Sequence, residues 1–124
     1  MRIAVPCSDD NGLESRISMH FGRSLYYAFV DVEDNEVKSF EIVPVSFEEH
    51  EPGDLPNFVK ERGGDIVIAY GMGRRAIDFF NQLGINVITG ASGTVREVID
   101  AFLKDRLETD KDWKSKEEFG HHES

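Results

Sequence analysis

The sequence is short of basic residues and of long apolar runs. It carries 14 Lys and Arg against 24 Asp and Glu, which gives a formal net charge of -10. Nucleic acids and anionic membranes are bound mainly through basic side chains, so this charge argues against both as partners. No charge-free apolar run reaches the ~18 residues that a membrane-spanning helix needs, and the first six residues are too short for a signal-peptide core. We therefore expect a cytoplasmic protein.

Cysteine occurs only once, as Cys7. A single cysteine excludes an internal disulfide and agrees with a reducing compartment. It also excludes the set of four thiolates that is typical of a permanently bound iron-sulfur cluster. A cysteine in a buried strand is most often an inert small hydrophobic residue, but a thiolate is also a soft ligand that suits iron or zinc. The sequence leaves open whether Cys7 faces a pocket or the core.

Common nucleotide-binding and catalytic motifs are also missing. No G-x-x-x-x-G-K-[ST] run is present, and the near match to G-x-G-x-x-G at residues 71–76 ends in alanine. The strand expected after it has no acidic residue that would bind a ribose hydroxyl. Aliphatic residues stand in the strands where a two-metal nuclease needs carboxylates. Because no triad or carboxylate pair can be assembled, we expect a protein that is not an enzyme.

Hydrophobic patterning predicts one α/β domain over residues 1–107. Apolar runs and a turn at Glu33-Asp34-Asn35 predict five strands, at residues 2–7, 26–32, 36–45, 65–70 and 85–89. Apolar residues at helical spacing predict three helices, at residues 55–62, 74–83 and 94–107. We expect Asp54 to cap the first helix, and Gly63-Gly64 and Gly84 to end the first two. The order β-β-β-α-β-α-β-α is typical of a layered α/β fold.

The remaining residues, 108–124, are expected to form a flexible charged tail. Trp113 and Phe119 stand among alternating charges, which favours disorder or loose docking through these two aromatic side chains over a second functional unit. His121 and His122 have metal-binding side chains, but two adjacent histidines near a terminus are a weak signal and also fit a remnant of cloning.

Two glycine-rich turns, residues 71–73 and 90–93, follow expected parallel strands and lead into helices. Ligands of open α/β sheets bind at the carboxyl ends of the strands, and helix N-termini there favour anions. Arg23, Arg74 and Arg75 would add positive charge. A tight turn that needs glycine only for packing explains either turn about as well.

The segment His20-Phe21-Gly22-Arg23 stands at a loop-to-strand junction. A single loop histidine usually has no special role, but this one is expected at the same edge of the sheet as both glycine turns and Cys7. A nucleophile-base pair of Cys7 with His20 lacks a third group that would orient it.

Three segments resemble a known family, the dinitrogenase iron-molybdenum cofactor biosynthesis family, with its NifX-like and NifB C-terminal-like domains. They are Ile3-Ala4-Val5-Pro6 leading to His20-Phe21-Gly22-Arg23-Ser24, then Gly71-Met72-Gly73-Arg74-Arg75-Ala76, then Val87-Ile88-Thr89-Gly90-Ala91-Ser92-Gly93-Thr94-Val95. The resemblance covers about residues 1–107. It implies a ribonuclease H-like three-layer fold, with a five-stranded mixed sheet of order 3-2-1-4-5, strand 2 antiparallel, and three helices.

The resemblance also implies a function, that of a small non-enzymatic carrier. Such a carrier transiently holds an iron-sulfur or iron-molybdenum cluster, or a precursor, and its partners are the metallocluster donor and acceptor proteins. The implied cofactor-binding residues are His20, Phe21, Gly22, Arg23, Gly71, Gly73, Arg74, Gly90, Ala91, Gly93 and Thr94, with His20 and Cys7 as metal ligands. The alternative is an adaptor that binds a phosphate-bearing small molecule or a protein partner in the same crevice. The oligomeric state is left open.

Overall fold

The computed structural model describes residues 1–19, 24–45, 54–107 and 109. Its strands are β1 (Arg2–Cys7), β2 (Tyr26–Glu33), β3 (Glu36–Pro44), β4 (Ile66–Ile68) and β5 (Asn86–Ile88). Its helices are α1 (Asp54–Glu61), α2 (Arg74–Gln82) and α3 (Val95–Leu103), with a short 3₁₀ helix, η1 (Gly12–Glu14), after β1. None of the helices in these ranges is long and apolar enough to cross a membrane.

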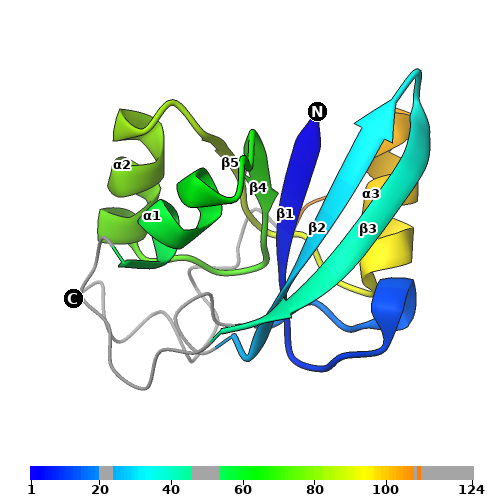
Figure 1. Ribbon diagram of the computed structural model, residues 1–124, viewed down its shortest axis with the longest axis horizontal. Helices are drawn as coiled ribbons and strands as arrows, with labels where there is room; N and C mark the ends of the chain where they lie inside the picture. Colours follow the sequence, from blue (N-terminus) through cyan, green and yellow to red (C-terminus); the bar gives the residue numbers. More distant parts are fainter. Residues whose placement is uncertain (20–23, 46–53, 108, 110–124) are drawn as a thin grey trace.

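The five strands form one mixed sheet in the order β3-β2-β1-β4-β5 (Figure 1). The central strand β1 pairs antiparallel with β2 and parallel with β4, and β5 pairs parallel with β4. The outer strand β3 pairs antiparallel with β2 through a turn in which Asp34 and Asn35 have φ of 55° and 61°. Two such left-handed residues make a tight hairpin turn whose twist matches that of the strands. The expected hairpin and the expected ribonuclease H-like fold are confirmed.

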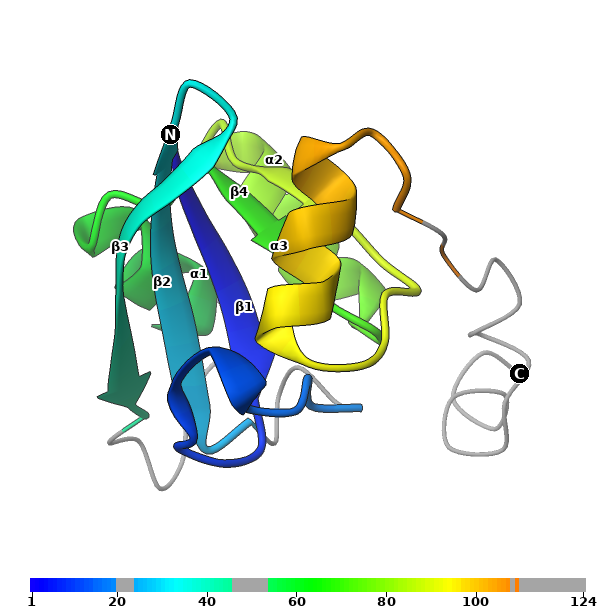
Figure 2. The same ribbon diagram turned by 90° about the vertical axis from the view of Figure 1, so that its right-hand side faces the viewer.

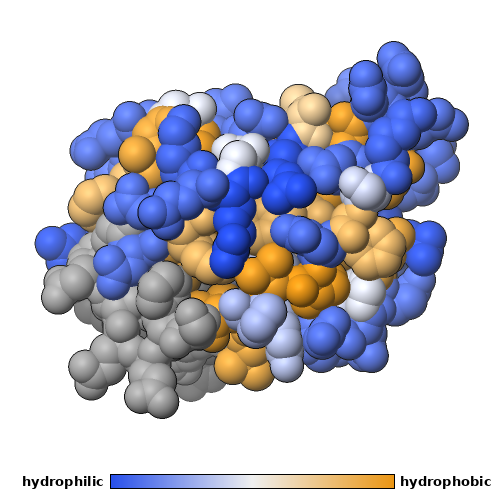
Figure 3. Space-filling model, viewed as in Figure 1, coloured by the Kyte–Doolittle hydropathy of each residue, from blue (hydrophilic) through white to orange (hydrophobic). Residues whose placement is uncertain are grey.

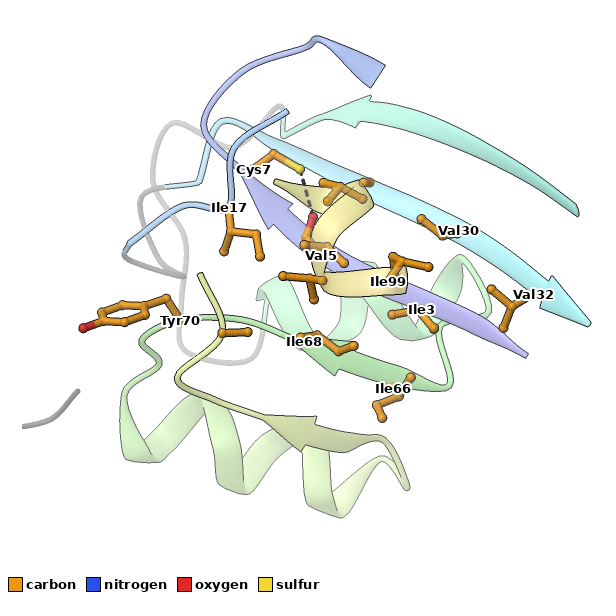
Figure 4. Close-up of a cluster of buried hydrophobic side chains, with 14 residues drawn as sticks. Ile3, Val5, Cys7, Ile17, Val30, Val32, Ile66, Ile68, Tyr70 and Ile99 are labelled. Carbon is orange, nitrogen blue, oxygen red and sulfur yellow. Dashed lines mark hydrogen bonds between the residues drawn. The ribbon is translucent and has the colours of Figure 1, made fainter. Parts of the chain in front are cut away.

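Helices cover both faces of the sheet, with α1 and α2 on one and α3 on the other (Figures 1 and 2). Residues of β1 alternate between the faces, as a strand requires. Ile3 and Val5 join the core cluster under α3, which Figure 4 shows, and Ala4 joins the cluster under α1 and α2. On the latter face, apolar side chains also show at the surface between α1 and β3, with hydrophilic ones around them (Figure 3). The core is therefore two-sided, and β1 lies in its middle.

The three helices end in the same way. After each of them a left-handed residue places two N–H groups on carbonyls of the last turn, which is the Schellman motif. Gly63 and Gly84 serve α1 and α2, as expected, with φ of 79° and 77°. After α3 the residue is Asp105, with φ of 56°, while Arg106 N–H donates to the Ala101 carbonyl at 2.7 Å.

The expectation that this third helix reaches residue 107 is therefore wrong, since α3 ends at Leu103. The other bounds agree to within two residues, and α1 includes Asp54, the expected cap, as its first residue.

An ion-pair network joins the strands at the end of the sheet where β1 begins. The Arg2 guanidinium donates to both carboxylate oxygens of Asp31, at 3.0 and 3.1 Å, and to the Arg62 carbonyl at 3.1 Å. The hydrogen bond from Arg2 lowers the pKa of Asp31. The backbone N–H of Arg2 donates to the carboxylate of Asp65 at 2.8 Å. This end of the sheet is thus held by polar contacts between segments far apart in the sequence.

Candidate functional site

The two glycine turns lie side by side at the carboxyl ends of β4 and β5. Ala69 N–H donates to the Ile88 carbonyl at 2.9 Å, and Gly90 N–H donates to the Tyr70 carbonyl at 2.7 Å. Ala91 N–H donates back to the Ala69 carbonyl at 3.1 Å. These bonds continue the pairing of the two strands beyond their ends. The predicted meeting of the two turns at one edge of the sheet is confirmed.

Residues 15–18 lie between the end of β1 and the second glycine turn. Ser18 N–H donates to the Pro6 carbonyl at 2.9 Å, and Ile17 N–H donates to the Gly93 carbonyl at 3.0 Å. Val95 N–H donates to the Ser15 carbonyl at 2.9 Å. The segment before the predicted histidine loop is therefore fixed to the same edge as the turns.

The histidine loop itself, His20-Phe21-Gly22-Arg23, lies outside the described residues. The structure places the chain on both sides of it. Before it, Ser18 is bonded to the end of β1, and after it, Tyr26 at the start of β2 pairs with Cys7, the last residue of β1. Both flanks thus lie where β1 ends.

Cys7 faces the core and not the edge of the sheet. It is fully buried in the cluster under α3, and its Sγ donates a hydrogen bond to the Val5 carbonyl at 3.2 Å (Figure 4). Burial raises the pKa of this thiol to about 12. Because the thiolate is the form that binds metals, Cys7 as placed here is a packing residue. A ligand role requires the side chain to lose its proton and leave the core, and it stays a prediction.

The N-terminus of α2 is open. Its first residue follows Gly73, which provides no side-chain cap, and the first turn of the helix contains no acidic residue. Arg74 and Arg75 are exposed, and neither guanidinium takes part in an ion pair within the described ranges. Free N–H groups, the positive end of the helix dipole and two arginines therefore coincide at the first glycine turn.

The N-terminus of α3 is closed by its own side chains. Thr94 Oγ1 accepts from Glu97 N–H at 3.2 Å, and Thr94 N–H donates to Glu97 Oε1 at 2.9 Å. This reciprocal arrangement is a capping box. The hydrogen bonds from Thr94, that of the backbone N–H first, lower the pKa of Glu97. A carboxylate of the chain therefore already stands where an anion would bind.

Glycine is required at position 93 in the second turn and not at position 73 in the first. Gly93 has φ of 109°, and a Cβ there would lie 2.8 Å from Glu97 Oε1. Gly73 has φ of -65°, and nothing lies within 4 Å of the position its Cβ would take. Gly93 therefore serves the backbone of its turn, whereas Gly73 leaves space free in front of α2.

The other predicted binding residues of the two turns contribute backbone or core atoms. Gly71, Gly90 and Ala91 are buried, and the Ala91 side chain belongs to the cluster under α3. Within the described ranges, no three His, Cys, Asp or Glu side chains are grouped so that they could hold a metal ion. The described part of the edge thus offers a helix end with free N–H groups and two arginines rather than a complete set of metal ligands.

Sequence reasoning missed Glu97, which decides that the second turn is closed. The signal was present, because Thr94-Val95-Arg96-Glu97 has the [ST]-x-x-E pattern of a capping box in front of an apolar helix.

Comparison with known proteins agrees with this architecture. A protein of Methanocaldococcus jannaschii with no assigned function is 32% identical over 111 residues, which cover 87% of this chain and 90% of that protein. The crystal structure of PH0822 has 54% sequence identity and a TM-score of 0.86, covering 92% of this chain and all of that one. The NMR structure of a Thermotoga protein provisionally assigned to NifB has 30% identity and a TM-score of 0.70, over 87% of this chain and 91% of that one.

The family model described as "Dinitrogenase iron-molybdenum cofactor" matches residues 1–105. That range contains the whole sheet, the three helices and both glycine turns. The resemblance seen in the three sequence segments is thereby confirmed over nearly the full domain. The chain belongs to the dinitrogenase iron-molybdenum cofactor family.

Proposed function

We propose that this protein is a non-enzymatic carrier in the cytoplasm. It holds an iron-sulfur or iron-molybdenum cluster, or a precursor, at the carboxyl edge of the sheet while a metallocofactor is assembled. Membership of the family supports a role in that assembly. The single observation that carries the proposal is the open N-terminus of α2 with its two arginines. The partners of a carrier are the proteins that donate and accept the cluster.

Among the described residues, the start of α2 is a place where the local charge fits an anionic cargo. The whole chain has a formal charge of -10, which repels anions in general. At the start of α2, free N–H groups and the helix dipole point toward the ligand, and Arg74 and Arg75 add two charges. Clusters with sulfide and thiolate ligands are anionic, so the local charge selects for them against the field of the rest of the surface.

We assign the first ligand role to His20. Its imidazole suits iron, and both flanks of its loop are bonded to the edge where the glycine turns meet. Phe21, Gly22 and Arg23 would then line the site beside it. A single imidazole with surrounding positive charge binds a cluster less firmly than four thiolates do, and a cargo that must be passed on requires such loose binding.

The residues of the two turns have different parts in this proposal. Gly71, Gly73 and Arg74 form the anion-binding end of α2. Gly90, Ala91, Gly93 and Thr94 form the opposite wall, which contributes shape and not N–H donors, because the capping box occupies the end of α3. Cys7 adds a thiolate only if its side chain leaves the core, so Cys7→Ser is expected to retain most of the binding.

The test is anaerobic reconstitution with ferrous iron and sulfide, followed by visible absorption. The wild-type protein is expected to take up a coloured cluster, His20→Ala to lose most of it, and the double variant Arg74→Gln, Arg75→Gln to bind more weakly. Arg96→Gln is the matched control, because Arg96 is exposed but paired with Glu14. Failure of the wild-type protein to take up a cluster, or equal uptake by wild type and His20→Ala, would contradict the proposal.

The open end of α2 also fits a phosphate group, which favours the adaptor as the second candidate function. Thermal unfolding with inorganic phosphate or a nucleotide, in the absence of metal, separates the two functions. A rise of the melting temperature that depends on Arg74 and Arg75, together with no cluster uptake, would support the adaptor.

A further inference from the structure

The two faces of the sheet are covered unequally. Two helices pack on one face and α3 alone on the other (Figures 1 and 2). The buried side of α3, with Val98 and Ile99, packs on the cluster that includes Ile3 and Val30 of the central strands. At the border of the sheet on this face, Ile88 of β5 is only partly buried. Among the described residues, the flank of α3 toward β5 is therefore covered only in part.

Two hollows lie along that flank. The larger, of about 610 Å³, lies between the second glycine turn, α3 and the segment after it, and its wall includes Gly93, Val98 and Ala101. The smaller, of about 370 Å³, is lined by Ile88 and Phe102. Leu107 and Thr109 line both. We call this double hollow the α3–β5 groove, and its wall also includes the charged residues Glu97, Asp105 and Arg106.

The chain beyond the family domain already enters the groove. The match to the family model ends at residue 105, where the left-handed Asp105 turns the chain back (Figure 2). Leu107 then packs against the core cluster under α3 and divides the groove in two. Thr109 is the last described residue, and it lies on the wall of both hollows. The described part of the chain therefore ends at the wall of the groove.

We propose that the α3–β5 groove is the docking site of the chain's own C-terminal segment, residues 110–124, and that the indole of Trp113 is its anchor. The segment lies outside the described residues. The wall combines apolar side chains, such as Val98 and Phe102, with polar ones, such as Glu97 and Arg106. An indole ring, which has a large apolar surface and one N–H donor, suits a wall of this mixed kind. The groove borders the proposed cluster site, because Gly93 lies in the walls of both, but the occupant that we propose for it lies beyond the residues that the family model matches.

The short tether between Thr109 and Trp113 favours the chain's own segment over the segment of a second copy as the occupant of the groove. Trp113 is four positions after Thr109 in the sequence, and an extended chain spans about 14 Å over four residue steps. Nine residues of α3 span about 13 Å, so Trp113 reaches any point along the helix. A short tether gives an effective concentration in the millimolar range, which exceeds that of a second copy in dilute solution.

The test uses tryptophan fluorescence of the full chain, because Trp113 is the only tryptophan. In the wild-type protein we expect blue-shifted emission and acrylamide quenching several-fold weaker than in urea. Ala101→Glu, which places a charge in the groove, is expected to shift the emission to the red and to restore quenching. Gln82→Glu is the matched control, since it introduces the same side chain at an exposed position of α2 on the other face.

A second measurement does not depend on the stability of any variant. Nuclear Overhauser contacts from the Trp113 indole to methyl groups of Val98, Ala101 or Leu107 are expected in the wild-type protein. Emission and quenching equal to those in urea, or contacts to other methyl groups only, would overturn the proposal. A blue shift that disappears on dilution would also overturn it, because it would assign the groove to the segment of a second copy.

Discussion

The turns before α2 and α3 are similar in sequence, but the helix ends that follow them are capped differently. Each follows a parallel strand, contains two glycines and leads into a helix at the same edge of the sheet. Before α2 the helix end is open, with Gly73 as cap and Ala76 three residues on. Before α3 it is closed, with Thr94 as cap and Glu97 three residues on. The residues at the cap and three positions after it therefore decide whether the helix end is open or closed.

The comparison also separates two uses of glycine. At the closed end Gly93 permits a backbone angle that other residues avoid, while at the open end Gly73 has an ordinary angle and simply leaves space. A glycine-rich turn before a helix therefore does not by itself indicate a ligand-binding site. The residue that caps the helix must be known as well. The predictions below test this difference by making the two ends more alike.

The largest effect is expected for Gly93→Ala. The strained backbone at φ of 109° and the close approach to Glu97 should lower the free energy of unfolding by about 2 kcal/mol. The matched change at the open end, Gly73→Ala, meets no atom within 4 Å and should cost less than about 1 kcal/mol. Urea denaturation of both variants measures the difference, and equal losses would show that the two glycines have the same role.

Thr94→Ala should have the next largest effect. It removes the oxygen that accepts from Glu97 N–H, and loss of such a cap costs about 1 kcal/mol. Thr94→Ser keeps the hydroxyl and should stay close to the wild type. If both variants lose the same stability in urea denaturation, the capping box does not stabilise α3.

Gly73→Asp converts the open end into a closed one. A carboxylate at this cap should raise the free energy of unfolding by about 0.5 kcal/mol, because it accepts from free N–H groups and faces the positive end of the helix dipole. It should at the same time weaken binding of the cluster or of phosphate. Gly73→Asn adds an uncharged cap, so comparing it with Gly73→Asp shows whether the charge or the filled space weakens binding. Unchanged anion binding by the Asp variant would argue against a site at α2.

The smallest effect concerns the pH dependence of the closed end. Hydrogen bonds from Thr94 lower the pKa of Glu97 below its usual 4.5, so the folded state favours the carboxylate. The contribution of the Glu97 carboxylate to the free energy of unfolding is fully present above pH 4.5. It is lost as the pH falls through the lowered pKa of Glu97 in the folded state. We therefore expect Glu97→Gln to be slightly less stable than the wild type at pH 7 and equal to it well below pH 4. If the difference in stability between Glu97→Gln and the wild type persists below pH 4, it arises from packing and not from the charge of Glu97.

Much of the fold could be predicted because its signals are local. The hairpin follows from Asp34 and Asn35, and two helix ends follow from Gly63 and Gly84. The end of α3 could not be read in the same way, because Asp105 rather than glycine takes the left-handed conformation. Packing of Leu107 against the core favours that turn, and such a contact between distant segments leaves no mark in the local pattern.

The site was predictable in its position more than in its chemistry. The order of strands and helices brings both turns to one edge, which the sequence indicates. The direction of the Cys7 side chain was not readable, because residues 2–7 are apolar almost throughout and show no alternation between two faces. The predicted histidine loop lies outside the described residues, so its part in the site stays a prediction.

The hydrogen bonds and the ion pair that Arg2 makes with Asp31, Asp65 and Arg62 lie at the opposite end of the sheet from the two turns. Stability gained there does not depend on which residues stand at the N-terminus of α2. Exposed positions such as Arg74 and Arg75 can therefore change without loss of these contacts, which would let natural selection fit one scaffold to different ligands.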